Sequence, residues 1–121
     1  MELVIYKKLT VSASGSDSTE NVPCYRKMTL KQARLVADTA VTHNGTNFVV
    51  IKLQKGSTDL GSRSFESVSM SAGASEAITL GGGNALDFSD LDELKITYDQ
   101  SNSGMAFDGG LVLVFEPRRE I

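Results

Sequence analysis

Carboxylates have the clearest potential for chemistry in this sequence, because four of them fall within seven residues: Asp87, Asp90, Asp92 and Glu93. Such a group could bind a cation or supply paired acid and base groups. It lacks the Asp-x-Asp-x-Asp-Gly spacing of a calcium loop, and no loop glycine follows it. The sequence therefore favours a solvated loop, and leaves open whether residues 87–93 bind a cation.

The other residues that could take part in catalysis do not form a recognisable motif. His43 is the only histidine, and it adjoins Asn44-Gly45 in a sequence without a Gly-x-Ser-x-Gly elbow. The three glycines at 81–83 precede no Lys-Ser/Thr pair, so they predict a flexible connection and not a phosphate loop. Cys24 is the single cysteine, which excludes an internal disulfide. We expect no catalytic residues, no cofactor, no metal site and no enzyme activity.

Aromatic side chains that stack on sugars offer a different kind of site. Tyr6, Tyr25 and Tyr98 could line such a platform, but the sequence has no tryptophan. Scattered tyrosines are more often half-buried residues of a sheet. Sugar binding is therefore the weaker of the two interpretations.

The bulk composition excludes several classes of protein. The chain has 121 residues and a net charge of −3, which disfavours a general nucleic-acid-binding role. No apolar run is long enough for a transmembrane helix. Lys7 and Lys8 follow the first apolar residues instead of preceding them, which is not the layout of a signal peptide. We expect folding in the cytoplasm, with no nucleic-acid or membrane partner.

Short segments of alternating apolar and polar residues predict an all-β protein. They are separated by Gly, Asn, Asp and Ser turns, and number about eight: residues 2–12, 22–26, 29–42, 47–55, 60–70 and 76–80, with two more inside 90–117. This spacing is typical of a single antiparallel β-sandwich, jelly-roll-like, spanning residues 1–121. A slip of phase between Phe65 and Val68 predicts a bulge there.

The connections carry three expectations of their own. Residues 12–21 are small and polar, which predicts a loop or arm. His43-Asn44-Gly45 predicts a hairpin turn. Pro117 predicts the end of the last strand and makes residues 117–121 a C-terminal tail.

Residues 29–42 fit two structures. Thr29 could cap a helix, and the Ala, Leu, Lys, Gln and Arg content mildly favours one. As a strand, the segment would place Ala33, Leu35 and Ala37 on one face. We predict a strand, because pairing with distant strands overrides weak local preference.

The last apolar run differs from the others because both of its faces are apolar. Leu111, Leu113 and Phe115 fill one face, while Val112 and Val114 fill the other. A strand that is apolar on both faces is covered on both. We hypothesise that a partner covers Val112 and Val114; a wholly internal strand is the alternative.

Three segments together resemble the head decoration, or cement, proteins of tailed-bacteriophage virions. They are residues 28–41 (MTLKQARLVADTAV), residues 44–56 (NGTNFVVIKLQKG), and residues 91–98 (LDELKITY) followed by Gly104 and residues 110–115 (GLVLVF). The resemblance covers about residues 22–116. Similar jelly rolls also occur in the tail and fibre proteins of phages. It implies a β-sandwich that includes residues 29–42, and it brings no catalytic residues.

The resemblance further implies a homo-oligomer, dimer or trimer, bound to the major capsid protein on the virion surface. The alternative is a tail or fibre module that binds a host-surface sugar or receptor. On the cement interpretation we expect the partner contacts on apolar strand faces and terminal arms: Glu2, Leu3, Phe48, Val50, Val112, Val114, Arg118, Arg119 and Ile121.

Overall fold

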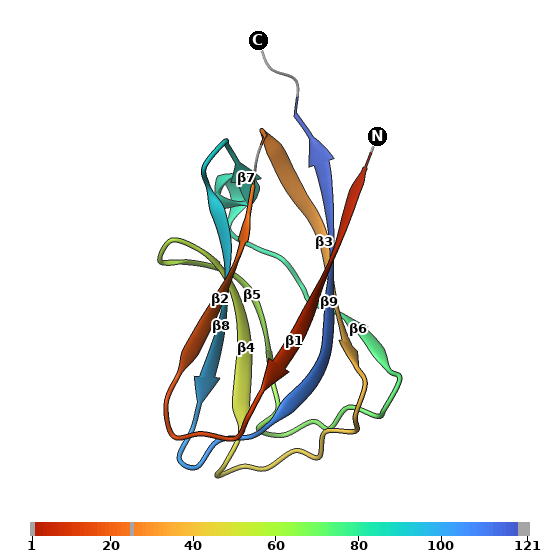
Figure 1. Ribbon diagram of the computed structural model, residues 1–121, viewed down its shortest axis with the longest axis vertical. Helices are drawn as coiled ribbons and strands as arrows, with labels where there is room; N and C mark the ends of the chain where they lie inside the picture. The colour runs from red at the N-terminus through yellow and green to blue at the C-terminus, as the bar shows by residue number, and fades with distance from the viewer. Residues whose placement is uncertain (1, 25, 119–121) are drawn as a thin grey trace.

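Two antiparallel sheets packed face to face make up the protein (Figure 1). The computed structural model describes residues 2–24 and 26–118. Its strands are β1 (Leu3–Val11), β2 (Ser18–Pro23), β3 (Met28–Ala37), β4 (Val49–Lys55), β5 (Thr58–Ser64), β6 (Ser75–Ala77), β7 (Asp87–Phe88), β8 (Glu93–Gln100) and β9 (Phe107–Pro117). The 3₁₀ helix η1 (Gly83–Leu86) is the one helical element among the described residues.

The strand order confirms the predicted jelly-roll-like sandwich. One sheet has the order β1-β9-β3-β6, with the short β7 also paired to β3, and the other has the order β2-β8-β4-β5. The chain passes from one sheet to the other between β1 and β2, again before β3 and again before β4, as a jelly roll winds. We call the first the β1/β9 sheet and the second the β8/β4 sheet.

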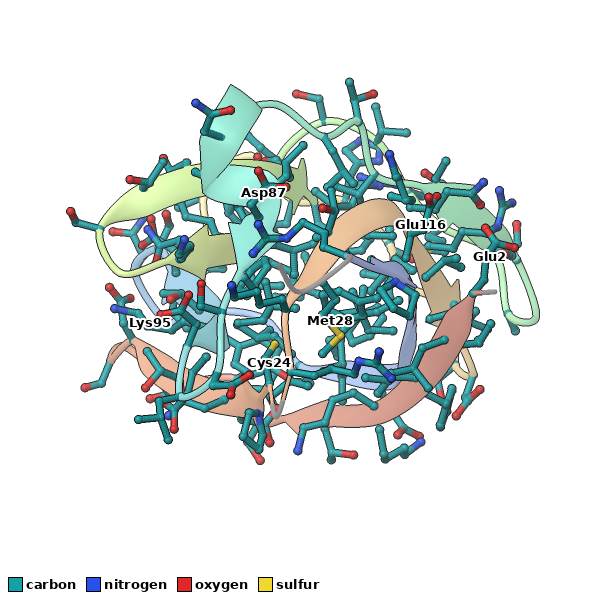
Figure 2. The ribbon with its side chains drawn as sticks, turned by 90° about the horizontal axis from the view of Figure 1, so that it is seen from above. Glu2, Cys24, Met28, Asp87, Lys95 and Glu116 are labelled. Carbon is teal, nitrogen blue, oxygen red and sulfur yellow. The ribbon has the colours of Figure 1, made fainter. Side chains whose placement is uncertain are left out.

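The core lies between the two sheets and is filled by alternate residues of each strand. β8 contributes Leu94, Ile96 and Tyr98, and β9 contributes Leu111, Leu113 and Phe115, all at most 1% exposed. The ring of Phe88 meets that of Phe115 edge-on, with 5.8 Å between their centroids. Cys24 and Met28, which Figure 2 labels, are also buried in this core.

β3 confirms that residues 29–42 begin as a strand and not as a helix. β3 pairs with β9 from Met28↔Pro117 to Ala37↔Gly109, with one register shift between Leu30 and Gln32. Ala33, Leu35 and Ala37 are buried on the inner face, as the alternation predicts. Pairing with a strand whose residues lie 72 to 89 positions away in sequence therefore outweighs local helix preference.

The hairpin predicted at His43-Asn44-Gly45 is wrong. β3 and β4 belong to different sheets, so this segment crosses from one sheet to the other. The Asn44 side-chain oxygen accepts hydrogen bonds from the backbone N–H groups of Thr46 and Asn47, both at 2.8 Å. The asparagine thus bends the chain locally, which a hairpin signal does not distinguish from true strand pairing.

Several other boundaries differ from the predicted ones; the strand expected over residues 76–80, for example, is β6, Ser75–Ala77. The loop expected over residues 12–21 ends at Asp17, because β2 pairs with β8 from Ser18↔Tyr98 onward. The strand expected over residues 60–70 ends at Ser64, and the register shift on β5 lies opposite Leu53 and Gln54, not between Phe65 and Val68. None of the described helices is long and apolar enough to cross a membrane.

Candidate interaction surfaces

The outer face of the β1/β9 sheet carries a row of apolar side chains that the core does not use. The cross-strand pairs Val4↔Val114 and Tyr6↔Val112 lie side by side on β1 and β9. Val4 is 61% exposed and Tyr6 57% exposed, while Val112 and Val114 are half-buried by their neighbours. Together with Val36 on β3, opposite Gly110, these residues define the apolar face.

Tyr6 is held in this face by a glycine on the neighbouring strand. A Cβ atom built on Gly110 would lie 2.3 Å from the Tyr6 ring, so the ring rests directly on the β9 backbone. Only glycine leaves room for that approach. The tyrosine therefore lies flat on the sheet and presents its exposed ring surface outward.

Charges surround the apolar face on two sides. Lys8 Nζ lies 2.7 Å from Asp38 Oδ2 and 2.8 Å from Asp108 Oδ1. Hydrogen bonds from the Lys8 ammonium hold the pKa of Asp108 below its usual range, and the two carboxylates raise the pKa of Lys8. On β3, Arg34 donates to the Ser75 hydroxyl at 3.0 Å. An apolar centre with a polar rim is the usual anatomy of a protein interface.

The outer face of the β8/β4 sheet has a polar surface. Lys52 Nζ lies 3.0 Å from Asp99 Oδ2, and the Thr97 hydroxyl donates to Gln54 Oε1 at 2.9 Å. Val50 stands between Ser64 and Asp99, its partners on the neighbouring strands. Phe48 lies half-buried just before β4. We call this the polar face.

The predicted contact residues are thus divided between surfaces. Val112 and Val114 lie on the apolar face, whereas Phe48 and Val50 lie on the opposite sheet. Glu2 is exposed just before β1, and Leu3 is 40% exposed at the start of that strand. Arg119 and Ile121 lie outside the described residues.

Arg118 was expected in a docking arm, but it contacts the body of its own chain. Its backbone N–H donates to the Lys27 carbonyl at 3.0 Å, and its Nη2 donates to the Phe88 carbonyl at 2.6 Å. The first bond connects the end of β9 to the start of β3, and the second connects it to β7. Arg118 is therefore a structural residue in the described chain.

Sequence reasoning missed Val4, Tyr6 and Val36 as members of the apolar face. The alternation in residues 2–12 places Val4 and Tyr6 opposite the inward Leu3, Ile5 and Leu9, so the signal was present. What the alternation could not supply was the neighbour: only the β1–β9 register places these side chains beside Val112 and Val114. The apolar face therefore forms only because β1 pairs with β9, a strand far from it in sequence.

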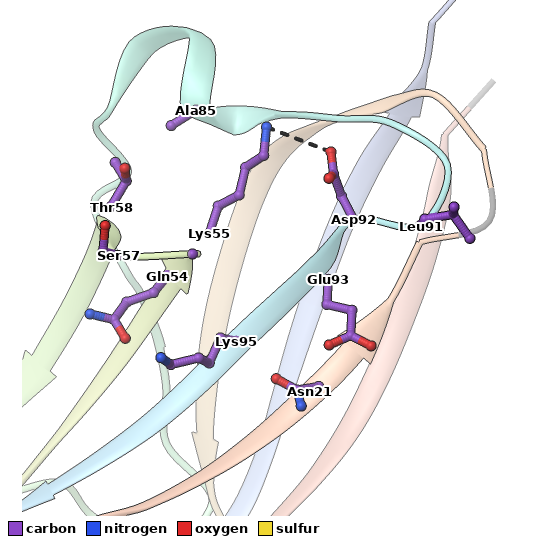
Figure 3. A pocket seen from close by; sticks show the side chains of 11 residues that line it. Asn21, Gln54, Lys55, Ser57, Thr58, Ala85, Leu91, Asp92, Glu93 and Lys95 are labelled. Atoms are coloured by element: carbon purple, nitrogen blue, oxygen red, sulfur yellow. Dashed lines mark ion pairs between the residues drawn. The ribbon is translucent and has the colours of Figure 1, made fainter.

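An open hollow of about 810 Å³ lies at one end of the β8/β4 sheet (Figure 3). Its lining includes Asn21, Gln54, Lys95 and Glu93, and Lys55 faces Asp92 across it at 3.6 Å. No aromatic side chain belongs to the described lining. The hollow therefore offers polar contacts but no stacking surface for a sugar ring.

The acidic cluster is spread over separate local contacts. Asp87 accepts a hydrogen bond from the Thr29 hydroxyl at 2.6 Å, and Asp92 accepts one from the Ser89 backbone N–H at 2.8 Å. Within residues 2–24 and 26–118, no three His, Cys, Asp or Glu side chains come together as a metal site would require. Asp87 and Asp92 thus act as structural acceptors of the loop.

The remaining candidates for chemistry are also apart from one another. His43 is exposed and its Nδ1 lies 2.9 Å from the Ser69 hydroxyl. Burial raises the pKa of the Cys24 thiol to about 11, so it stays protonated at neutral pH. Tyr98 is buried and donates to Glu20 at 2.7 Å, whereas Tyr6 lies on the outer face of the other sheet. Tyr25 lies outside the described residues, and Tyr6 and Tyr98 share no surface.

No protein-family model matches the chain, and no curated protein matches it significantly.

Proposed function

We propose that this chain is a structural protein of a tailed-bacteriophage virion, a decoration or cement protein that binds the major capsid protein on the outside of the shell. The jelly-roll fold and the three segments similar to that family support the proposal. The observation that carries it is the apolar face, where Val4 and Tyr6 are more than half exposed beside Val112 and Val114. Exposed apolar groups gathered on one sheet face are typical of a protein-binding surface.

The mechanism is physical and needs no catalytic group. A protein that binds the assembled shell and not its dispersed subunits stabilises the assembly by mass action. Many copies on a symmetric shell multiply a modest contact through avidity. The chain would fold in the host cytoplasm and act on the capsid surface.

The apolar face supplies the contact with the capsid in this proposal. Val112 and Val114 occupy the strand at the middle of the face, so a partner would desolvate them most completely. Lys8, Asp38 and Arg34 at the rim would orient the partner without adding much affinity, because exposed charges are well solvated.

The alternative is a tail or fibre module that binds a host sugar or receptor. It would use a hollow with aromatic rings for stacking, and no aromatic ring belongs to the described lining of the hollow in Figure 3. The apolar face therefore favours the cement function over the alternative.

The location of the protein in the virion is tested first, by counting its copies. Purified virions are digested and the copies of this chain are quantified by mass spectrometry against the major capsid protein. A cement protein is expected in hundreds of copies per virion. A few copies per virion, or recovery with isolated tails, contradicts the proposal.

The role of the apolar face is then tested by measuring how variants of this protein bind to expanded and unexpanded capsid shells. The Val112→Asp/Val114→Asp double variant is expected to lose binding to expanded shells, because it places charge at the middle of the apolar face. Val50 is also a predicted contact residue, but it lies on the polar face, so Val50→Asp is the matched control and is expected to bind as the unmodified chain does. Equal loss in both variants contradicts this assignment of the face, and equal binding to both shell forms removes the link to maturation.

A further inference from the structure

One edge of the sandwich has a free backbone. β1 is the end strand of its sheet and pairs only with β9, from Leu3↔Phe115 to Val11↔Phe107. No other backbone–backbone hydrogen bond from residues 3–11 occurs in the described chain. Alternate N–H and C=O groups along nine residues therefore point away from the sheet and can accept another strand.

The other three edges are protected in ways that β1 is not. β2 is polar and ends in Pro23; β5 carries a register shift, and β6 has three residues. β1 is the longest of the four edges, and its pairing has no register shift. Its first half is apolar, and only Lys7 and Lys8 in the second half place charge on the edge. Long, flat and apolar edge strands are the ones that add a further strand.

We propose that two copies of this chain associate through β1, antiparallel, about a two-fold axis that passes beside Ile5. The two β1/β9 sheets would then form one continuous sheet across the axis. Such a contact is isologous, so the same strand must be complementary to itself.

The side chains of β1 meet that condition when Ile5 is the centre. Residues that are equally far from Ile5 in sequence, on opposite sides of it, then become cross-strand partners. Val4 of each copy faces Tyr6 of the other copy on the outer surface, which gives two such contacts. Aromatic and β-branched side chains are favourable cross-strand partners. A two-fold axis beside Lys7 or Lys8 would place two like charges opposite each other. An axis beside Tyr6 would place the apolar Val4 opposite the charged Lys8.

Charges at the ends of the strand support the same register. Glu2 faces Lys8 of the other copy when Ile5 is central. In its own chain, Glu2 lies at the same end of the sheet as Glu116 (Figure 2), and the described chain gives neither carboxylate an ion-pair partner. The Lys8 ammonium has three donors, of which Asp38 and Asp108 take two. Because those aspartates offset its charge, Glu2 helps to select the register more than it adds affinity.

The pairing is a property of the free protein and does not depend on capsid binding. It would join the apolar faces of two copies, so that Val4, Tyr6, Val112 and Val114 of both lie on one surface. A capsid partner would then meet an apolar face of twice the extent. The shell-binding assay and the association assay consequently fail or succeed separately.

Sedimentation equilibrium of the full chain over a range of concentrations tests the association. We expect a dimer whose dissociation constant rises at least about tenfold in Val4→Asp, because both Val4–Tyr6 contacts are lost. Gln32→Asp lies on the outer face of the same sheet, two strands away from the edge, and is expected to leave the dissociation constant unchanged. A monomer at all concentrations overturns the proposal. Equal weakening in both variants also overturns it, because that result indicates stacking of faces.

Cysteine cross-linking tests the register. Ile5 and Val11 are both half-buried residues on the inner side of β1, so they form a matched pair. Under mild oxidation Ile5→Cys is expected to give a covalent dimer, since the two thiols meet across the axis. Val11→Cys has no partner strand beside it in this register and is expected to stay monomeric on denaturing gels, as is the unmodified chain with its buried Cys24. A cross-link through Val11→Cys and not through Ile5→Cys overturns the register.

Discussion

The two outer faces of the sandwich differ in what they leave to solvent. On the apolar face, β1 and β9 present Val4, Tyr6, Val112 and Val114 in adjacent positions. On the polar face, β4 and β8 present Lys52 against Asp99 and Gln54 against Thr97, so polar groups satisfy one another. Both faces cover the same core, yet only one leaves a set of apolar groups without a cover in the described chain.

The difference shows that burial of the core does not decide the outer residues. Inward positions on both sheets are mostly apolar, as Ile51, Ile96 and Leu113 illustrate, and Gln100 is the buried polar exception among the described residues. Outward positions are free to vary, because each sheet needs only one apolar face to fold. An apolar outer face is therefore a feature that folding alone does not require, which is why we propose a partner for it.

The largest expected effect separates the two sides of β9. Leu113→Ala removes a fully buried side chain and is expected to lower the free energy of unfolding by about 2–5 kcal/mol. Val112→Ala, one residue away on the apolar face, is expected to cost less than about 1 kcal/mol, because solvent already reaches it. Urea titration of both variants measures the two values. A cost for Val112→Ala close to that of Leu113→Ala would place Val112 energetically in the core and remove the contrast between the faces.

Sequence alone predicted the parts of this fold that depend on local alternation. Ala33, Leu35 and Ala37 share the inner face of β3 as predicted, and Leu111, Leu113 and Phe115 share the inner face of β9. The period of two identifies a strand and its faces without reference to any partner. The antiparallel sandwich then followed from the number and spacing of such strands.

Pairing between distant strands could not be predicted in the same way. Asn44-Gly45 signals a change of direction whether the chain folds back in one sheet or crosses to the other, and here it crosses. Ser18 and Thr19 are polar yet form β2, because β8 offers them an edge to pair with. The apolar face was half predicted for the same reason: Val112 and Val114 were evident from their own strand, while Val4 and Tyr6 required the β1–β9 register.

A smaller effect is expected from the ion pair on the polar face. Lys52 and Asp99 are partly exposed, and surface pairs of this kind contribute about 0.2–1 kcal/mol, less in high salt. A double-mutant cycle with Lys52→Ala and Asp99→Ala is expected to give a coupling energy in the lower half of that range. Repeating the cycle in 1 M salt is expected to bring it near zero. A coupling that is large and independent of salt would mean that the polar face is also desolvated, and would weaken the contrast with the apolar face.

The smallest expected effect concerns Lys8, Asp38 and Asp108 at the rim of the apolar face. Folding lowers the pKa of Asp108 and raises that of Lys8, chiefly through the hydrogen bonds between them. The contribution of Asp108 to the stability of the fold is therefore present above its ordinary pKa of 3.8, and it is lost as pH falls through the depressed pKa in the folded state. The contribution of Lys8 to stability is present below its ordinary pKa of 10.5 and is lost as pH rises through the raised pKa in the folded state.

The melting-temperature difference between the unmodified chain and Lys8→Met should thus be constant between about pH 5 and 9 and shrink outside that window. Lys31→Met is the control, because Lys31 is exposed and has no ion pair within the described residues. A Lys8→Met difference that persists unchanged well below pH 3.8 would show that Lys8 stabilises the fold by packing and not by charge, and that the rim of the apolar face is less polar than its ion pairs indicate.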